Sequence, residues 1–205
     1  MTAAEARIRD YAFEEIASAG FYIAFRIEFL LPEFEHNSLP RPWVHKYTQQ
    51  GLLMMDPVLR WVYCNAGSIR WSEVDIPDTS GVLGEAAKYD LNFGAAISLR
   101  DEDDPSIRSF GNFCRSDREL TSSEIEELGR RLELLFADLT APDDVTEAET
   151  EVLAAIRDGE LLKEIAFKLG ISEGAVKQRL RSAKDKLGAR TTPQAVSMAS
   201  DYGLL

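Results

Sequence analysis

Cationic side chains gather in one short segment near the end of the chain. Between residues 172 and 190 there are six cations against two acids, a local charge of +4 in a chain whose net charge is −12. The cations are Lys177, Arg179, Arg181, Lys184, Lys186 and Arg190. Basic amphipathic helices are often only solvated surfaces, but cations concentrated on one helix also neutralise phosphates. The segment therefore predicts DNA contact, with Lys177, Gln178 and Arg181 at bases or phosphates and Lys184 at a phosphate or in solvent.

A second group of residues is aromatic and acidic. It comprises Trp43, Tyr47, Asp56 and Trp71. Buried tryptophan and tyrosine are most often core packing, and an aspartate before a proline is usually a helix cap. An indole N–H, a phenol hydroxyl and a carboxylate in an apolar pocket can also orient a ligand with an apolar body and an amide or carbonyl head. The residues alone leave both interpretations open.

Catalytic and metal chemistry have little support. We find neither a Ser-His nor a Cys-His constellation, so we expect no enzyme and no catalytic residues. Cys64 and Cys114 lack C-x-x-C spacing and nearby His partners, which argues against a disulfide, a metal site or a cofactor. The acidic run 101–104 is most simply a solvated hairpin loop; it lacks the spaced ligands and glycine of a calcium loop.

The elements that position the basic segment read as a helix-turn-helix. Ile165, Ala166 and Leu169 have helical spacing, and Gly170 then interrupts the pattern. Gly170 suits a left-handed position after a helix, and Ser172 suits the cap of the next one. The second helix continues the apolar spacing with Val176, Leu180, Ala183 and Leu187.

The first 139 residues predict helices flanking a mostly antiparallel sheet. The expected helices cover 2–20, 43–51, a short stretch from Pro57, 82–91 and 122–139. The expected strands cover 21–31, 94–99 and 107–115, with an extended stretch at 67–71 and a proline-punctuated loop between Pro32 and Trp43. We therefore expect an α+β protein: an α/β/α sandwich around an antiparallel sheet in residues 1–139, a linker at 140–145, and a small all-α helix-turn-helix domain in 146–205.

Charge divides the chain in the same way. Residues 145–205 hold nine cations and nine acids, so the whole net charge of −12 lies on the preceding part, which is not expected to touch DNA. The sequence contains no basic-plus-apolar signal stretch and no run of eighteen apolar residues. We expect a soluble, cytoplasmic protein with no membrane partner.

A longer motif runs through the basic end of the chain. Its pattern is T-x-x-E-x-E-V-L, a Gly, E-I-A-x-x-L-G-I-S, T/A-V-K and K-L. The matching residues are Thr146, Glu149, Glu151, Val152, Leu153, Gly159, Glu164, Ile165, Ala166, Leu169, Gly170, Ile171, Ser172, Ala175, Val176, Lys177, Lys186 and Leu187. Residues 145–205 thereby resemble the C-terminal DNA-binding domain of the LuxR family of transcription regulators. The resemblance implies double-stranded operator DNA as a partner and a homodimer, paired through the helices at 122–139 and 193–202.

The order Trp43, Tyr47, Asp56-Pro57 and Trp71 also resembles the autoinducer-binding domain of LuxR-type quorum-sensing receptors. The resemblance implies an N-acyl homoserine lactone or a related amphiphile, with Trp43 at the lactone carbonyl, Asp56 at the amide, and Tyr47 and Trp71 as walls. Two departures point to an altered ligand, or to a receptor that works without one. Leu39 stands where many relatives carry a tyrosine, and Cys114 stands where relatives often place Ser or Thr. The alternative is a ligand-independent regulator whose first domain serves dimerisation or protein contact.

Overall fold

The computed structural model describes residues 3–28, 31–101, 104, 106–142 and 144–205. Its internal contacts form two compact units, Met1–Glu133 and Leu134–Leu205. Each unit is built around its own apolar core.

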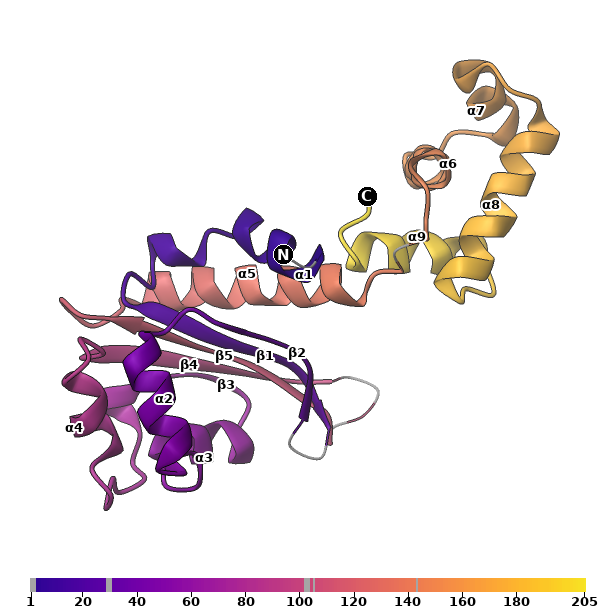
Figure 1. The fold of residues 1–205 in the computed structure, drawn as a ribbon. Coiled ribbons are helices and arrows are strands. Elements are labelled where there is room, and N and C mark those ends of the chain that lie inside the picture. The colour runs from indigo at the N-terminus through magenta and orange to yellow at the C-terminus, as the bar shows by residue number, and fades with distance from the viewer. Residues whose placement is uncertain (1–2, 29–30, 102–103, 105, 143) are drawn as a thin grey trace. The chain divides into compact units, whose positions relative to one another are not determined.

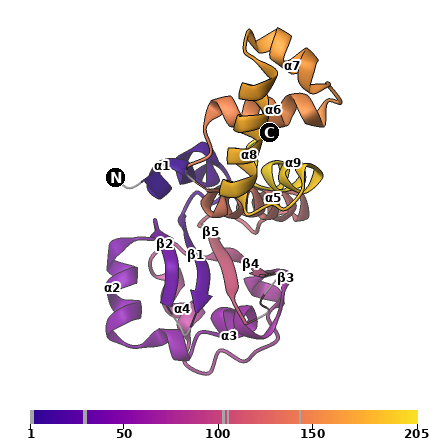
Figure 2. The ribbon, with the colours of Figure 1, turned by 90° about the vertical axis from the view of Figure 1, so that its right-hand side faces the viewer.

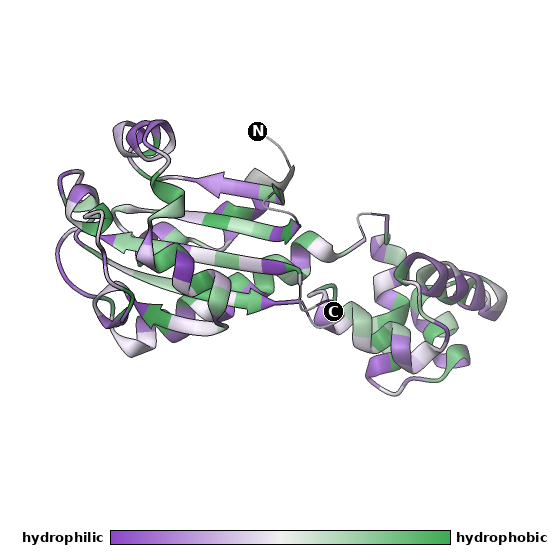
Figure 3. Ribbon diagram, turned by 90° about the horizontal axis from the view of Figure 1, so that it is seen from below, coloured by the Kyte–Doolittle hydropathy of each residue, from purple (hydrophilic) through white to green (hydrophobic). Residues whose placement is uncertain are grey.

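A five-stranded sheet forms the centre of the first unit. Its strands are β1 Gly20–Glu28, β2 Leu31–Asn37, β3 Gly67–Arg70, β4 Phe93–Arg100 and β5 Arg108–Arg115. They lie in the order β2-β1-β5-β4-β3, and every neighbouring pair is antiparallel. The predicted antiparallel sheet is confirmed. The central strands carry most of the apolar residues, whereas the edge strand β2 is mostly hydrophilic (Figure 3).

One face of the sheet is covered by α1 Ala3–Asp10 and by α5 Ser122–Thr140 (Figures 1 and 2). In α5, Ile125, Leu128 and Leu132 are buried at helical spacing. A Cβ on Gly111 of β5 would lie 2.5 Å from the Phe113 ring and 3.2 Å from Leu132 Cδ2, so the absence of a side chain there leaves room for that ring and for α5. The long helix expected at 122–139 is confirmed.

The opposite face carries α2 Arg41–Gln49, α3 Pro57–Cys64 and α4 Val82–Ala87, with 3₁₀ turns at Leu52–Met54 (η2) and Trp71–Glu73 (η3) (Figure 1). The two helical layers and the sheet between them make the expected α/β/α sandwich. α3 begins with Pro57 at its first position, as predicted, because that position needs no N–H donor.

Two helix predictions for this unit were wrong in part. The helix expected at 2–20 ends at Asp10, because Ala12 has a φ of 46° and the chain continues as a 3₁₀ turn, Phe13–Glu15 (η1). This break buries Phe13 between Phe21 and Phe113, with ring centroids 5.4 Å from each. The helix expected at 82–91 ends at Ala87, and Asp90 has a φ of 64°.

The expected loop between Pro32 and Trp43 contains a strand that the sequence did not reveal, β2. It pairs on one side only, with β1, and a proline is tolerated in such an edge strand because no ladder bond is lost on the open side. Four residues assigned to strand or loop, Phe29, Leu30, Glu102 and Asp103, lie outside the described residues, as do Pro105 and the linker residue Asp143. Asp101 accepts a hydrogen bond from Arg26, and Asp104 accepts one from Ser106.

The second unit contains α6 Glu147–Arg157, α7 Leu162–Leu169, α8 Glu173–Leu187 and α9 Thr192–Asp201. One apolar cluster joins α6, α7 and α8 around Val152, Ile165 and Val176, and another joins α6, α8 and α9 around Leu153 and Leu187. Gly170 has a φ of 64° after α7, and the Ser172 hydroxyl accepts a 3.1 Å hydrogen bond from the Ala175 amide. The predicted helix-turn-helix and both of its capping residues are confirmed.

Across the described part of the chain, every helix is too short or too polar to cross a membrane.

Candidate functional site

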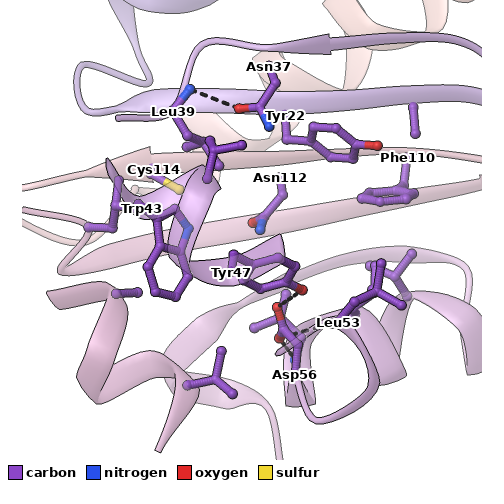
Figure 4. A pocket seen from close by; sticks show the side chains of 18 of the residues that line it. Tyr22, Asn37, Leu39, Trp43, Tyr47, Leu53, Asp56, Phe110, Asn112 and Cys114 are labelled. Atoms are coloured by element: carbon purple, nitrogen blue, oxygen red, sulfur yellow. Dashed lines mark hydrogen bonds between the residues drawn. The ribbon is translucent and has the colours of Figure 1, made fainter. Parts of the chain in front are cut away.

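A cavity of about 320 Å³ lies between the sheet and the helical layer formed by α2, α3 and α4. Figure 4 shows the side chains around it. The structure brings all five of the predicted ligand-binding residues to its lining: Trp43, Tyr47, Asp56, Trp71 and Cys114. Predicted residues that are up to 71 positions apart in the sequence (43 and 114) therefore line one cavity.

Asp56 has two roles in this cavity. Its Oδ1 accepts from the backbone amides of Val58 at 2.8 Å and Leu59 at 3.2 Å, which caps α3. Its Oδ2 accepts from the Tyr47 hydroxyl at 2.8 Å. Burial raises the pKa of Asp56 above its ordinary value, although these hydrogen bonds oppose the rise. A carboxylate offers about four acceptor sites, so one remains available to a donor from a guest.

Trp43 presents an indole N–H to the same space (Figure 4). The residue is 5% exposed, and its rings pack 5.4 Å from Tyr47 and 5.7 Å from Tyr89. The hydrogen bonds of the described residues include none from this N–H. Because the helix α2 fixes the indole, the free donor is held in place for an acceptor on a guest.

Trp71 forms the wall next to the sheet. Its indole N–H donates a 2.8 Å hydrogen bond to Asn112 Oδ1, and its ring lies directly over Gly94. A Cβ on Gly94 would come within 2.3 Å of Trp71 Cε2, which explains why this strand position lacks a side chain. The Trp71 N–H is thus already bonded within the protein. Unlike the N–H of Trp43, it is not available to a guest.

Asn112 is a lining residue that the sequence did not reveal. The indole of Trp71 can only donate, so the Asn112 atom facing it is the oxygen, and the Asn112 NH₂ is left as a donor. Within the described structure this NH₂ makes no hydrogen bond. Cys114, the predicted residue on the same strand face, is fully buried. Burial and the charge of Asp56 raise the pKa of its thiol, so the thiol stays neutral. A neutral thiol is a weak hydrogen-bond partner. The alternation Phe110, Asn112, Cys114 along β5 was the signal that could have found Asn112.

α3 is held at its other end by Arg108, a buried residue of β5. Its Nη1 donates to the backbone oxygens of Val62 at 2.7 Å and Asn65 at 2.6 Å, and to Ser98 Oγ at 2.9 Å. A cation at a helix C-terminus compensates the partial negative charge of the last carbonyls. The helix that supplies Val58, Leu59 and Val62 to the cavity is therefore fixed at both ends by charged side chains.

The basic helix α8 presents one polar and one apolar face. Val176, Ala183 and Leu187 are buried, whereas Lys177, Gln178 and Arg181 are exposed and Lys184 is half-buried. Residues 177, 181 and 184 have the i, i+4, i+7 spacing of a single helix face. This exposed face is the arrangement that a helix needs to enter a DNA groove.

Lys186 does not belong to that face, although it is one of the cations clustered in the sequence. Its Nζ donates to Glu149 Oε2 at 2.8 Å and to the Asp144 backbone oxygen at 2.5 Å. Burial opposes the charge of Glu149, but hydrogen bonds from Lys186, Ser182 and Thr146 outweigh it and lower the pKa of Glu149 to about 2. Lys186 therefore joins α8 to α6 inside the second unit.

Comparison with known sequences bears on both sites. Residues 3–139 match the profile of the family described as "Autoinducer binding domain", and residues 143–199 match "Bacterial regulatory proteins, luxR family". The chain belongs to the LuxR family of transcription regulators. As a LuxR-family member it is a DNA-binding transcription regulator with an autoinducer-binding domain, and the family is one of regulators, as expected, not of enzymes.

Individual LuxR-family relatives cover most of the chain. The quorum-sensing regulator RhlR of Pseudomonas aeruginosa is 27% identical over 211 residues, which is 94% of this chain and 87% of RhlR. A shorter match covers the DNA-binding end: the transcriptional regulatory protein YdfI of Bacillus subtilis is 49% identical over 61 residues, 30% of this chain and 29% of YdfI.

A crystal structure of Escherichia coli SdiA has the same fold, with a TM-score of 0.52 and 23% identity over 100% of this chain and 92% of SdiA. A structure of SdiA in complex with octanoyl-rac-glycerol gives a TM-score of 0.50 at 23% identity, over 100% of this chain and 90% of that one.

Proposed function

We propose that the cavity binds an N-acyl homoserine lactone or a closely related amphiphile. The observation that carries this proposal is that a fixed indole donor on Trp43, with no hydrogen bond to a described residue, faces the same cavity as a partly unused buried acceptor on Asp56. An acyl homoserine lactone carries the complementary groups, a lactone carbonyl and an amide N–H, on an apolar chain. The apolar lining contributed by residues such as Val58, Val62 and Phe110 suits that chain.

In this proposal each polar group has one role. Trp43 donates to the lactone carbonyl, Asp56 accepts from the amide N–H, and Tyr47 and Trp71 form the walls. Asn112, rather than Cys114, donates to the acyl carbonyl, because an amide NH₂ is a much stronger donor than a thiol. A charge-assisted bond from the amide to Asp56 would use the acceptor site that the protein leaves open.

We propose further that the protein acts as a homodimer. Residues 1–139 form the ligand domain, residues 140–145 the linker, and residues 146–205 the DNA-binding domain. Lys177, Gln178, Arg181 and Lys184 contact operator DNA from α8, and two such helices read half-sites about one helical turn apart. Ligand binding favours the DNA-competent state only by its differential affinity for that state.

Thermal unfolding with a panel of lactones tests the ligand. The panel contains acyl homoserine lactones of increasing chain length together with octanoyl-rac-glycerol, the compound bound in the SdiA structure. A ligand at one hundred times its dissociation constant should stabilise the protein by about 2.7 kcal/mol. If no compound raises the melting temperature and mass spectrometry finds none copurified, the ligand-independent regulator is the correct interpretation.

A further inference from the structure

The cavity opens to solvent at one side of the first unit. Its lining residues on β2, Glu35 and Asn37, are exposed, as are Leu53 of η2 at 45% and Tyr63 of α3 at 37%. The residues assigned to the ligand's head lie deep in the same cavity, with Asp56 only 8% exposed. In the arrangement we consider, a guest has its head at the buried end and its other end at these exposed lining residues, which we call the mouth.

The mouth carries a polar cluster of its own, made by Tyr22, Glu35 and Asn37. The Tyr22 hydroxyl donates a 2.7 Å hydrogen bond to Glu35 Oε2. Tyr22 and Asn37 are register partners on β1 and β2, and Glu35 lies two residues from Asn37, so the three side chains share the face that lines the cavity. Burial, reinforced by the bond to Glu35, raises the pKa of Tyr22, so its hydroxyl remains protonated.

This cluster has hydrogen-bonding capacity left over. Glu35 Oε1 has no donor among the described residues. Asn37 Oδ1 accepts from the Leu39 amide at 3.1 Å, which leaves the Asn37 NH₂ as a donor. A carboxylate oxygen beside a free amide donor suits a group that donates strongly, such as a hydroxyl or an ammonium.

The charge of the whole cavity favours the same kind of guest. Its described lining contains two acids, Asp56 and Glu35, and no lysine, arginine or histidine. Six aromatic rings also line it, and their faces carry partial negative charge. The lining rings are those of Tyr22, Trp43, Tyr47, Tyr63, Trp71 and Phe110. An anionic group would therefore meet repulsion at both ends of the cavity.

We infer that Tyr22, Glu35 and Asn37 form a second polar subsite, which recognises a hydrogen-bond-donating group at the far end of the ligand's chain and rejects a carboxylate there. The inference rests on the proposed function, because it takes the head to lie at Trp43 and Asp56. This subsite makes the protein selective for a ligand whose chain ends in a polar group over one with a simple alkyl chain.

The test uses homoserine lactones that differ only at the end of the acyl chain. Lactones with chains of eight, ten and twelve carbons, each ending in methyl, hydroxyl, ammonium or carboxylate, are titrated into the full chain by calorimetry. At the chain length that binds best, the hydroxyl and ammonium forms should bind about three- to tenfold more tightly than the methyl form, and the carboxylate more weakly. Glu35→Gln and Tyr22→Phe should each bring the affinities of the four forms closer together.

Glu33→Gln provides the matched control. Glu33 lies on the same strand and loses the same charge, but it pairs with Arg26 and does not line the cavity. The inference is overturned if the four end groups bind wild-type protein equally, or if their order survives Glu35→Gln. It is also overturned if Glu33→Gln removes the order as fully as Glu35→Gln does.

Failure of the head assignment gives a different result, since no lactone then binds at all. In that case the mouth is tested by displacement of the neutral fluorescent probe N-phenyl-1-naphthylamine with octanol, octylammonium and octanoate. Octanoate should displace the probe least from wild-type protein, and its deficit should disappear in Glu35→Gln. Equal displacement by the three compounds, or failure of the probe to bind, overturns the inference.

Discussion

The Tyr47 hydroxyl and the Asp56 carboxylate are joined by a 2.8 Å hydrogen bond across the cavity wall, from α2 to the N-cap of α3. The other oxygen of Asp56 caps α3 through the amides of Val58 and Leu59. One carboxylate thus both fixes the helix that lines the cavity and offers an acceptor to its contents. The two roles can be separated experimentally.

Replacement of Asp56 by asparagine should affect ligand binding far more than folding. Asparagine caps helices about as well as aspartate, so the free energy of unfolding should change by less than about 1 kcal/mol. Loss of a charged acceptor should weaken an acyl homoserine lactone by about ten- to a hundredfold. Urea unfolding and calorimetric titration measure the two effects. Comparable losses in both would leave Asp56 as a helix cap alone.

Gly94→Ala should displace Trp71 from the cavity wall. The added Cβ would lie 2.3 Å from Trp71 Cε2, so the indole must move and its hydrogen bond to Asn112 is strained. We expect a loss of about 1–3 kcal/mol in unfolding free energy together with weaker ligand binding. Gly84→Ala in α4 is the control, because a Cβ there meets nothing within 4 Å and should cost no stability. Unchanged stability and ligand affinity in Gly94→Ala would show that the Trp71 side chain can adopt another position without loss.

Removal of the Arg108 side chain should loosen the end of α3. Arg108→Met leaves the Val62 and Asn65 carbonyls without their guanidinium donor, and we expect a loss of about 2 kcal/mol in unfolding free energy. Arg100→Met, on the paired position of β4, removes an exposed arginine whose hydrogen bond to α3 is a long one, 3.4 Å to the Cys64 oxygen, and should change stability by less than about 0.5 kcal/mol. Denaturant unfolding of both variants decides the matter, and equal effects would contradict a special role for Arg108.

These relationships mark the limit of what the sequence could predict. The helix-turn-helix was found because its signals are local: Gly170 and Ser172 lie beside the helix ends they define. The edge strand β2 was missed because it contains Pro32, carries a polar exposed face and is specified by pairing with β1. Five lining residues were anticipated by resemblance. Asn112 was missed although it alternates with Phe110 and Cys114 along β5, because its contact with Trp71 joins positions 41 residues apart. Likewise, Lys186 could not be assigned to Glu149 from sequence, since 37 positions separate them.

Glu149 should make the second unit sensitive to acid. Its pKa is about 2 in the folded chain against an ordinary value of 4.5, so the unfolded chain takes up a proton first as the pH falls. The stability it contributes is fully present above pH 4.5 and is lost as the pH falls towards about 2. Glu149→Gln should therefore flatten the dependence of unfolding free energy on pH in this window. Glu147→Gln, an exposed acid of the same helix turn, is the control and should leave the slope close to that of wild type.

The exposed face of α8 should govern the salt dependence of DNA binding. The slope of log K against log salt falls by about 0.9 for every phosphate that the protein no longer neutralises, so the double variant Lys177→Ala, Arg181→Ala should lower it by about two if both side chains bind phosphate. Lys186→Ala removes the same kind of charge from the same helix but breaks the ion pair with Glu149, so it should lower stability and leave the slope nearly unchanged. Fluorescence anisotropy on a duplex selected from a randomised pool, repeated at several salt concentrations, measures the slopes. Equal slopes for the double variant and wild type would require a different face of the second unit to meet DNA, because the charges removed are the ones that α8 exposes.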